Sequence, residues 1–199
     1  MPVLLSELPE STVGEVLRHK TWTRAEVEIL ESTGLFEGRH FELIEGELID
    51  KTGKNRWHTL GLARTRRILD TLFGAEYVYT EAPIDIAPVD NPKNEPEPDV
   101  YVLRQKLEDL PGNPTFADLA LVVEVADSSL RLDLKVKARL YARAGIVEYW
   151  VLDLNNRLLH VFRQPENDEY SGRIELAETE SIAPLAKPGA DIAVSQLLP

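Results

Sequence analysis

Hydrophobic residues recur at helical spacing in three parts of the chain. Residues 23–33 (TRAEVEILEST) predict a short helix, because Thr23 is a candidate cap with Glu26 three residues further on. Residues 56–73 (RWHTLGLARTRRILDTLF) carry apolar side chains on one helical face. Residues 133–145 (DLKVKARLYARAG) predict a third helix that ends at its glycine.

Other segments follow the two-residue period of a β-strand or are apolar throughout. The strongest is LALVVEVA (119–126), whose nearly continuous run of strand-forming residues predicts a central strand covered on both faces. Alternation around Glu45–Gly46 in FELIEGELID predicts a hairpin of two short strands. The remaining predicted strands are YVYTEAPIDIAP (77–88), either continuous or broken at Pro83, DVYVL (99–103) and a final pair, EYWVLDL and RLLHVFR, joined by Asn155–Asn156.

The order of helix, hairpin, helix, strands, helix and strands predicts an α/β or α+β fold, with a mixed sheet flanked by helices. A length of 199 residues fits one domain. We assign residues 21–199 to this domain and residues 1–20, which show no clear periodicity, to an N-terminal extension. The short apolar segment at the end of the tail is expected to dock on the domain.

The composition, with 43% hydrophobic and 28% charged residues, is that of an ordinary globular protein. The absence of cysteine excludes structural disulfides and thiolate chemistry. No apolar run approaches the roughly 18 residues that span a bilayer, so we expect a cytoplasmic protein without a membrane partner. A net charge of −12 opposes non-specific binding to nucleic acid, although the local field at a site can differ, above all where a metal binds.

Glu124 is the acid in the most costly position. It lies inside LVVEV, where a charge is expensive unless it is paired or bound to metal. It shares a face with Val122 and lies near the C-terminal end of the strand, where open α/β sheets place their sites. The alternative is that Glu124 pairs with a buried base only to fix the strand register.

Asp99 and Lys137 are the two other candidates for chemistry. Asp99 opens DVYVL directly after Pro98, so its carboxylate is presented at the start of a strand; alternatively it simply ends a loop. On a helical wheel, Lys137 falls on the apolar face whereas Lys135 points away from it. An inward ammonium needs a carboxylate partner, unless it extends past the edge of the sheet into water.

Together, Asp99, Glu124 and Lys137 predict metal-dependent cleavage of a phosphodiester bond. Two carboxylates suit Mg²⁺ or Mn²⁺, and the lysine is placed to orient the attacking water or to stabilise charge on the phosphoryl oxygens. An acid-pair glycosidase would need no inward lysine, which argues against that class of enzyme.

Several segments resemble the Uma2-type (DUF820) family of restriction-endonuclease-like proteins in the PD-(D/E)XK nuclease superfamily. The resemblance covers roughly residues 23–198 and is carried by FELIEGEL, His58, PDV (98–100), LVVEV, DLKVKARLYARAGIVEYWVLD and LAKPGADIAVSQLL. It implies a restriction-endonuclease-like core, DNA cleavage, metal ligation by Asp99 and Glu124, and catalysis by these two residues with Lys137.

The chain departs from the superfamily pattern in two places. Ala126 stands where the pattern puts a lysine, two residues after Glu124, so the resemblance implies that Lys137 has taken over that role. Asp127–Ser128 replaces the usual Ser-Pro, and Asp127 either caps the turn or adds a carboxylate to the site.

Glu45 and His58 also fall in matching motifs. They are either accessory site residues or, respectively, a turn acid and a surface histidine. Two function classes remain open: a Mg²⁺-dependent endonuclease, for which a homodimer would let two sites cut two strands, and a catalytically weak or inactive nuclease fold with a binding or regulatory role.

Overall fold

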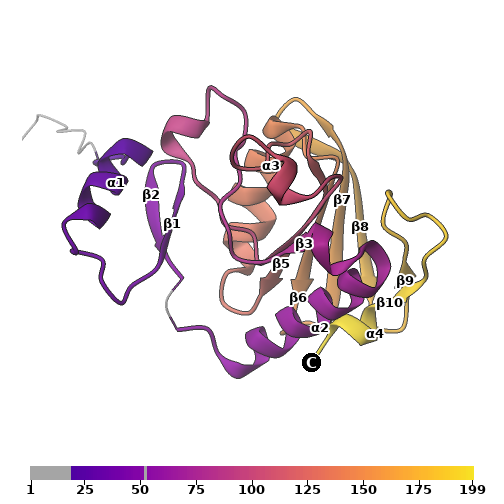
Figure 1. Cartoon of the computed structure of the whole chain (residues 1–199). Coiled ribbons are helices and arrows are strands. Elements are labelled where there is room, and N and C mark those ends of the chain that lie inside the picture. Colours follow the sequence, from indigo (N-terminus) through magenta and orange to yellow (C-terminus); the bar gives the residue numbers. More distant parts are fainter. Residues whose placement is uncertain (1–18, 52) are drawn as a thin grey trace, which may run out of the picture.

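The computed structural model describes residues 19–51 and 53–199 (Figure 1). Of the extension predicted for residues 1–20, residues 1–18 lie outside the described part. The helices are α1 (Arg24–Ser32), α2 (Arg56–Phe73), the π-helix η4 (Leu132–Lys137), α3 (Ala138–Ala144) and α4 (Val194–Leu197), with short 3-10 turns at Ala75–Tyr77, Asn91–Lys93 and Leu107–Asp109. The strands are β1 (Phe41–Ile44), β2 (Glu47–Asp50), β3 (Val78–Tyr79), β4 (Val100–Leu103), β5 (Leu119–Ala126), β6 (Glu148–Asp153), β7 (Leu158–Glu166), β8 (Glu169–Ala177), β9 (Ser181–Ile182) and β10 (Ile192–Ala193).

Strands β3 to β8 form one mixed sheet in the order β3-β4-β5-β6-β7-β8. β5 and β6 are parallel, and η4 with α3 forms the crossover between them, whereas the other neighbouring strands are antiparallel. β4 lies beside β5, with Val100 opposite Val123. The strands that carry Asp99 and Glu124 are therefore neighbours, as predicted.

Hydrophobic cores cover both faces of this sheet, which is why β5 is apolar throughout. On one face, Leu69 of α2 and the apolar end of the tail pack against Val123 and Val125, so the predicted docking of the tail is confirmed. On the other face, α3 and the β1–β2 hairpin cover the sheet, and Val122 belongs to their core. Figure 1 shows α2 and α4 together on one side and α3 on the other.

The β1–β2 hairpin turns at Glu45 and Gly46, whose φ angles of 51° and 79° are those of a two-residue type I′ turn. The loop before β4 holds the hairpin in place. The Glu95 amide donates to the Leu43 carbonyl at 2.7 Å, and the Gly46 amide donates to the Lys93 carbonyl at 2.8 Å. This docking brings the hairpin next to the segment that leads into Asp99.

The prediction of a strand over residues 77–88 is wrong in its extent, since Val78 and Tyr79 alone pair with β4. Beyond them the chain leaves the sheet, and the Ile84 amide donates to the Pro96 carbonyl in a loop at 3.1 Å. Ile84 and Ile86 are buried at 0% and 2% exposure. Their alternation therefore reflects burial beneath loops and imitates the pattern of a strand.

The prediction that RLLHVFR ends the sheet is also wrong, because β8 adds a nine-residue edge strand beside β7. Leu176 is the buried residue of β8, and most of its other residues are exposed. An edge strand with so little apolar surface has no hydrophobic period by which to recognise it.

The helix predicted over residues 133–145 begins as the π-helix η4, continues as α3, and ends at Gly145 in the left-handed region, at φ 84°. Asp133 and Lys137 are both buried in η4. A π-helical turn is uncommon and is often found at functional sites.

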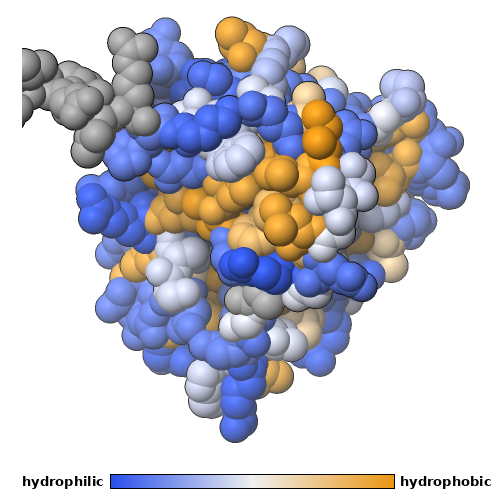
Figure 2. All heavy atoms as spheres, turned by 90° about the vertical axis from the view of Figure 1, so that its left-hand side faces the viewer, coloured by the Kyte–Doolittle hydropathy of each residue, from blue (hydrophilic) through white to orange (hydrophobic). Residues whose placement is uncertain are grey.

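In the part of the chain that the structure describes, no helix is long and apolar enough to cross a membrane. Figure 2 looks onto the side that carries α1 and the hairpin, and hydrophobic residues gather near the middle of this face. Elsewhere on that face the surface is mostly polar.

Candidate functional site

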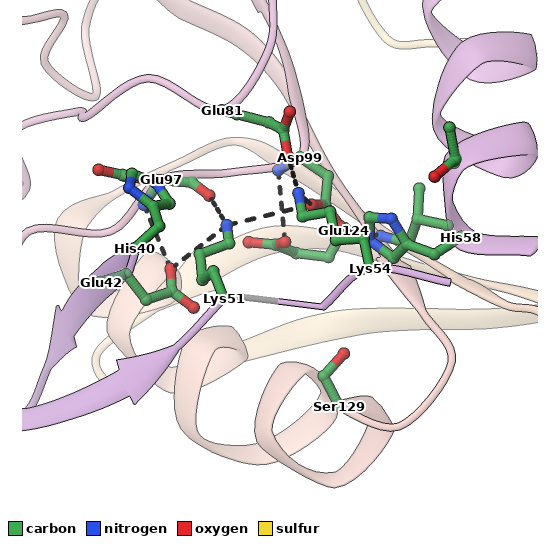
Figure 3. A network of polar contacts seen from close by, with 12 residues as sticks. His40, Glu42, Lys51, Lys54, His58, Glu81, Glu97, Asp99, Glu124 and Ser129 are labelled. Atoms are coloured by element: carbon green, nitrogen blue, oxygen red, sulfur yellow. Dashed lines mark hydrogen bonds and ion pairs between the residues drawn. The ribbon is translucent and has the colours of Figure 1, made fainter. Parts of the chain in front are cut away.

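A pocket of about 150 Å³ lies where the C-terminal end of β5 meets the hairpin, the start of α2 and the start of η4. Its charged lining comes from all of these elements. The ionisable residues are Glu42, Asp50, Lys51, Lys54, His58, Asp99, Glu124, Asp127, Asp133 and Lys137. Figure 3 shows the polar contacts on the hairpin side of this pocket.

Asp99 enters the pocket from the start of β4 and is 4% exposed. Its Oδ2 accepts a hydrogen bond from the Val125 amide at 2.8 Å and lies 3.1 Å from Nε2 of His58. Its Oδ1 accepts one from Nζ of Lys54 at 3.3 Å. Burial raises the pKa of Asp99, but the His58 hydrogen bond and the lysine charges outweigh burial and hold it well below its usual range. Asp99 is therefore ionised.

Glu124, on the neighbouring strand β5, is 2% exposed. Its Oε1 accepts hydrogen bonds from Nζ of Lys137 at 2.9 Å and from the Tyr141 hydroxyl at 3.1 Å. Its Oε2 accepts a long bond, of 3.4 Å, from the Asp99 amide. Burial raises the pKa of Glu124 to about 8, although the Lys137 ammonium opposes the shift. Oε2 is thus the more weakly engaged oxygen of this carboxylate.

Lys137 points inward, as the helical wheel predicts, whereas Lys135 is exposed. Its Nζ lies 2.8 Å from Oε1 of Glu42 and 2.9 Å from Oε1 of Glu124, with Asp133 at 3.9 Å. Burial lowers the pKa of this lysine, but Glu124 and Glu42 raise it well above its usual value. The side chain is an ammonium ion surrounded by carboxylates.

The hairpin contributes Glu42 and, directly after β2, Lys51. Glu42 is 3% exposed. The Lys51 ammonium lies between two acids, 3.9 Å from Oε2 of Glu42 and 4.0 Å from Oδ1 of Asp99, and it also donates to the Glu97 carbonyl. Figure 3 shows this bridging position. Lys51 thereby links the Lys137 cluster to Asp99.

His58 lies in the first turn of α2, where Oδ1 of Asn55 accepts hydrogen bonds from two backbone amides and caps the helix. Its Nε2 faces Asp99, while its Nδ1 is buried and has no hydrogen-bond partner among the described residues. Asp127 accepts a hydrogen bond from Nδ2 of Asn55 at 2.5 Å. It therefore ties the loop after β5 to the start of α2.

Glu45 lies away from the pocket. It occupies the hairpin tip, where its Oε1 pairs with Nη2 of Arg143 at 2.5 Å. Of the five residues singled out from the sequence, the structure brings together Asp99, Glu124, Lys137 and His58. It leaves out Glu45.

Sequence reasoning missed several ionisable groups that the fold brings here: Glu42, Lys51, Lys54, Asp133 and Tyr141. A signal existed for two of them. Glu42 shares a strand face with Ile44, and Asp133 lies four residues before Lys137, on the same side of a helix. Lys51 and Lys54 lie in a loop without periodicity, so no pattern of residues predicts where they point.

The donor set fits a hard divalent cation. Asp99 and Glu124 supply carboxylate oxygens at one pocket, and no group of three or more His, Cys, Asp or Glu side chains within the described residues is arranged to hold a metal. Mg²⁺ commonly uses one or two carboxylates and completes its shell with water and substrate phosphate. A two-carboxylate site of this kind therefore suits Mg²⁺ or Mn²⁺ better than a softer metal.

Comparisons with known proteins give the family and the fold of the chain. The family model "Uma2: Putative restriction endonuclease" matches residues 25–195. Among solved structures, "a putative nuclease belonging to DUF820 from Anabaena variabilis ATCC 29413" aligns with a TM-score of 0.65 at 14% identity, over 88% of this chain and 96% of that one. A search of curated proteins gave no match. The predicted fold, a mixed sheet flanked by helices in a nuclease-like arrangement, is confirmed.

Proposed function

The chain belongs to the Uma2 family of restriction-endonuclease-like proteins, and from that membership we propose that it is a metal-dependent endonuclease acting on DNA. One observation carries the proposal. Glu124 lies on β5, and Asp99 directly precedes the neighbouring strand β4. The Asp99 amide donates to the Glu124 side chain, and both residues line the same pocket. Buried carboxylates that face each other are unfavourable unless cations hold them.

In this proposal Asp99 and Glu124 hold Mg²⁺ or Mn²⁺. When bound, the ion supplies Lewis-acid polarisation of the scissile phosphate and a lowered pKa for the attacking water. Lys137 positions the Glu124 carboxylate. Its 2.9 Å hydrogen bond holds Oε1 and leaves Oε2 on the side of Asp99. It also places a positive charge near the phosphoryl oxygens.

Lys54 and His58 are the basic groups closest to where substrate would enter. The Lys54 side chain is 24% exposed, against 3% for Lys137, and both Lys54 and His58 contact Asp99. A phosphate that approached Asp99 would meet these two groups first. We assign to them the contact with the substrate phosphate, which stabilises the charge that develops on its oxygens.

A non-catalytic binding protein is the second candidate, and one observation favours it. Both oxygens of Asp99 already have partners in the protein, from Val125, His58 and Lys54. If those contacts persist when metal is present, Oδ2 of Asp99 is fully occupied, and an ion could bind only at Oδ1, beside the Lys54 ammonium. Such a protein would retain the fold without the chemistry.

The test is cleavage of supercoiled plasmid in Mn²⁺ or Mg²⁺, compared with EDTA. We expect wild-type protein to nick the plasmid in metal, and Asp99→Asn and Glu124→Gln to lose at least about 100-fold in rate. Glu108→Gln is the matched control, because Glu108 is an exposed acid on the turn after β4. Loss of rate in Glu108→Gln equal to that in the site variants, or cleavage that persists in EDTA, would contradict the proposal.

We propose further that the protein is a cytoplasmic homodimer, which would place two sites on the two strands of a duplex. Light scattering coupled to size-exclusion chromatography tests the dimer directly. A mass near twice 22.4 kDa is expected, and a mass of one chain across the working concentration range would rule the dimer out.

A further inference from the structure

Exposed cations are grouped on the outer face of the helix whose inner face carries Asp133 and Lys137. Three cations follow one another at four-residue spacing, and all three are exposed: Arg131 directly before η4, Lys135 in η4 and Arg139 in α3. Such spacing places side chains on one side of a helix. We call these three residues the basic row.

No described carboxylate lies within 4.0 Å of the basic row, and the same holds for Arg173 on β8. This is unexpected in a chain with 34 acidic and 22 basic residues, where an exposed cation has many possible partners. By contrast, the neighbouring Arg143 is held by Glu45 at 2.5 Å and by Asp90 at 2.7 Å. The charge of the basic row is therefore open to an outside anion.

The basic row is continuous with the site. A hollow beside η4 is lined by Arg131, Lys135 and Val136 together with Ser128, Ser129 and Leu132. The last three residues also line the Asp99–Glu124 pocket. The two concave regions are therefore adjacent and share these three lining residues. A nucleic-acid strand that passed from the pocket across them would reach the basic row directly.

On its other side, the basic row borders a hollow of about 340 Å³ between α3 and the β7–β8 edge. Lys135, Arg139 and Arg173 line this hollow. The Arg173 guanidinium makes a cation–π contact with the Phe162 ring, 5.1 Å from its centre. Among the described residues that line this hollow, Glu169 is the one acid. The surface therefore offers several positive charges to a ligand that extends beyond a single anionic group.

We propose that the basic row, with Arg173, binds the phosphate backbone of the nucleic acid whose scissile phosphate enters the Asp99–Glu124 pocket; the proposal rests on the nuclease function proposed above. Cations that follow one another along one side of a helix suit a strand that carries one phosphate per roughly 3.4 Å of helix axis. A local positive track next to the site also explains how a chain of net charge −12 approaches a polyanion.

The test measures binding of a fluorescein-labelled 25-base-pair DNA duplex in EDTA, across a range of salt concentrations. One variant combines Arg131→Ala, Lys135→Ala and Arg139→Ala. Its matched control combines Arg67→Ala, Arg104→Ala and Lys187→Ala, three exposed cations that also lack a carboxylate within 4.0 Å among the described residues and lie on other elements. Both variants lose three positive charges, so a difference in their DNA affinity reports the position of the lost charges and not their number.

We expect the basic-row variant to bind at least about tenfold more weakly than wild type. Its plot of log affinity against log salt should also be less steep by about 2 to 3, at roughly 0.9 per lost phosphate contact. The control is expected to change affinity less than about twofold. Equal losses in the two variants, no loss in the basic-row variant, or no binding by wild-type protein would each overturn the inference.

The two proposals can fail separately, because DNA binding is measured in EDTA, where no cleavage is required, and cleavage is measured in Mn²⁺. Binding that depends on the basic row, together with no cleavage in Mn²⁺, supports the inference and contradicts the nuclease. If the protein cleaves DNA in Mn²⁺ but the basic-row variant binds DNA as tightly as wild type, the nuclease proposal is supported and the inference is overturned.

Discussion

At the scale of single residues, the dominant feature is a lysine that neutralises several buried acids. The Lys137 ammonium is bonded to Glu42 and Glu124, and Asp133 lies at 3.9 Å. None of these four side chains is more than 3% exposed. Without Lys137, the cation that remains beside these acids is Lys51, 3.9 Å from Glu42, and a buried charge that is not compensated is costly.

Lys137→Met is therefore expected to destabilise the fold by about 3–5 kcal/mol near pH 8, in addition to any effect on catalysis. The loss should shrink toward pH 5.5. In the folded protein the pKa of Glu124 is raised to about 8 and that of Asp133 to about 6, both mainly by burial, so both acids take up protons on acidification. Lys137 lowers the pKa of both acids, so without it they take up these protons at higher pH, and the variant gains more stability than the wild type as pH falls.

Urea unfolding at pH 5.5 and pH 8 measures this difference. Lys106→Met, a change at a lysine whose side chain is 42% exposed, is the control and should cost less than about 0.5 kcal/mol. A cost for Lys137→Met as small as that of the control would mean that the buried acids do not need the lysine.

Glu124 gives a second prediction, on pH. Because its pKa is raised to about 8, mainly by burial, it is largely protonated at pH 6 and must lose that proton to bind a metal. Affinity for Mn²⁺ should therefore rise about tenfold from pH 6 to pH 7 and level off above pH 8. Calorimetric titration at each pH measures the slope, and an affinity that is flat from pH 6 to pH 8 would show that Glu124 is not a ligand.

The sequence could predict those residues whose position makes a charge expensive. Glu124 in an apolar strand and Lys137 on an apolar helical face both led to the pocket. Lys51 and Lys54 were out of reach, since their placement depends on how the hairpin docks against the loop before Asp99. For Glu45 the sequence leaves two interpretations, an accessory site residue or a turn acid, because a shared motif does not say which way a hairpin tip points; in the structure Glu45 pairs with Arg143.

At the scale of elements, the hairpin controls the geometry of the site, because it carries Glu42 and leads into Lys51. Its turn depends on Gly46, which has φ 79° and packs closely against the chain before α1. A Cβ added at this position would lie 2.8 Å from Cβ of Thr21 and 3.2 Å from the Trp22 carbonyl oxygen. Neither contact can be relieved without a shift of the backbone.

Gly46→Ala is accordingly expected to cost about 1–3 kcal/mol, for the positive φ and for the close contacts. Gly112→Ala is the matched control, because Gly112 has ordinary backbone geometry and nothing within 4 Å of an added Cβ. Thermal or urea unfolding compares the two. Equal stability of both variants would show that the turn is more adaptable than its close contacts suggest.

Elements were predictable where burial imposes a period, and unpredictable where it does not. The bounds of α2 and β5 match the pattern of apolar residues residue for residue. β8 was missed because its outer face is solvated, and the 77–88 strand was overextended because loops can bury alternate residues as a sheet does. The π-helical start of the third helix has no signature in the spacing of its side chains.

At the scale of the whole molecule, the basic row is a group of exposed cations on an acidic protein. The net charge of −12 coexists with a pocket that contains Lys51, Lys54, His58 and Lys137, and with the basic row next to it. The overall charge should slow association with DNA at low salt, while the local cations determine where contact is made.

Binding of Mn²⁺ by isothermal titration calorimetry, in the absence of nucleic acid, tests most directly whether Asp99 and Glu124 form one metal site. The result depends on no choice of DNA sequence. The account predicts one Mn²⁺ per chain for wild-type protein and for Glu108→Gln, with binding weakened at least about tenfold in both Asp99→Asn and Glu124→Gln. Unchanged Mn²⁺ affinity in either of these two variants, while both remain folded, would contradict it.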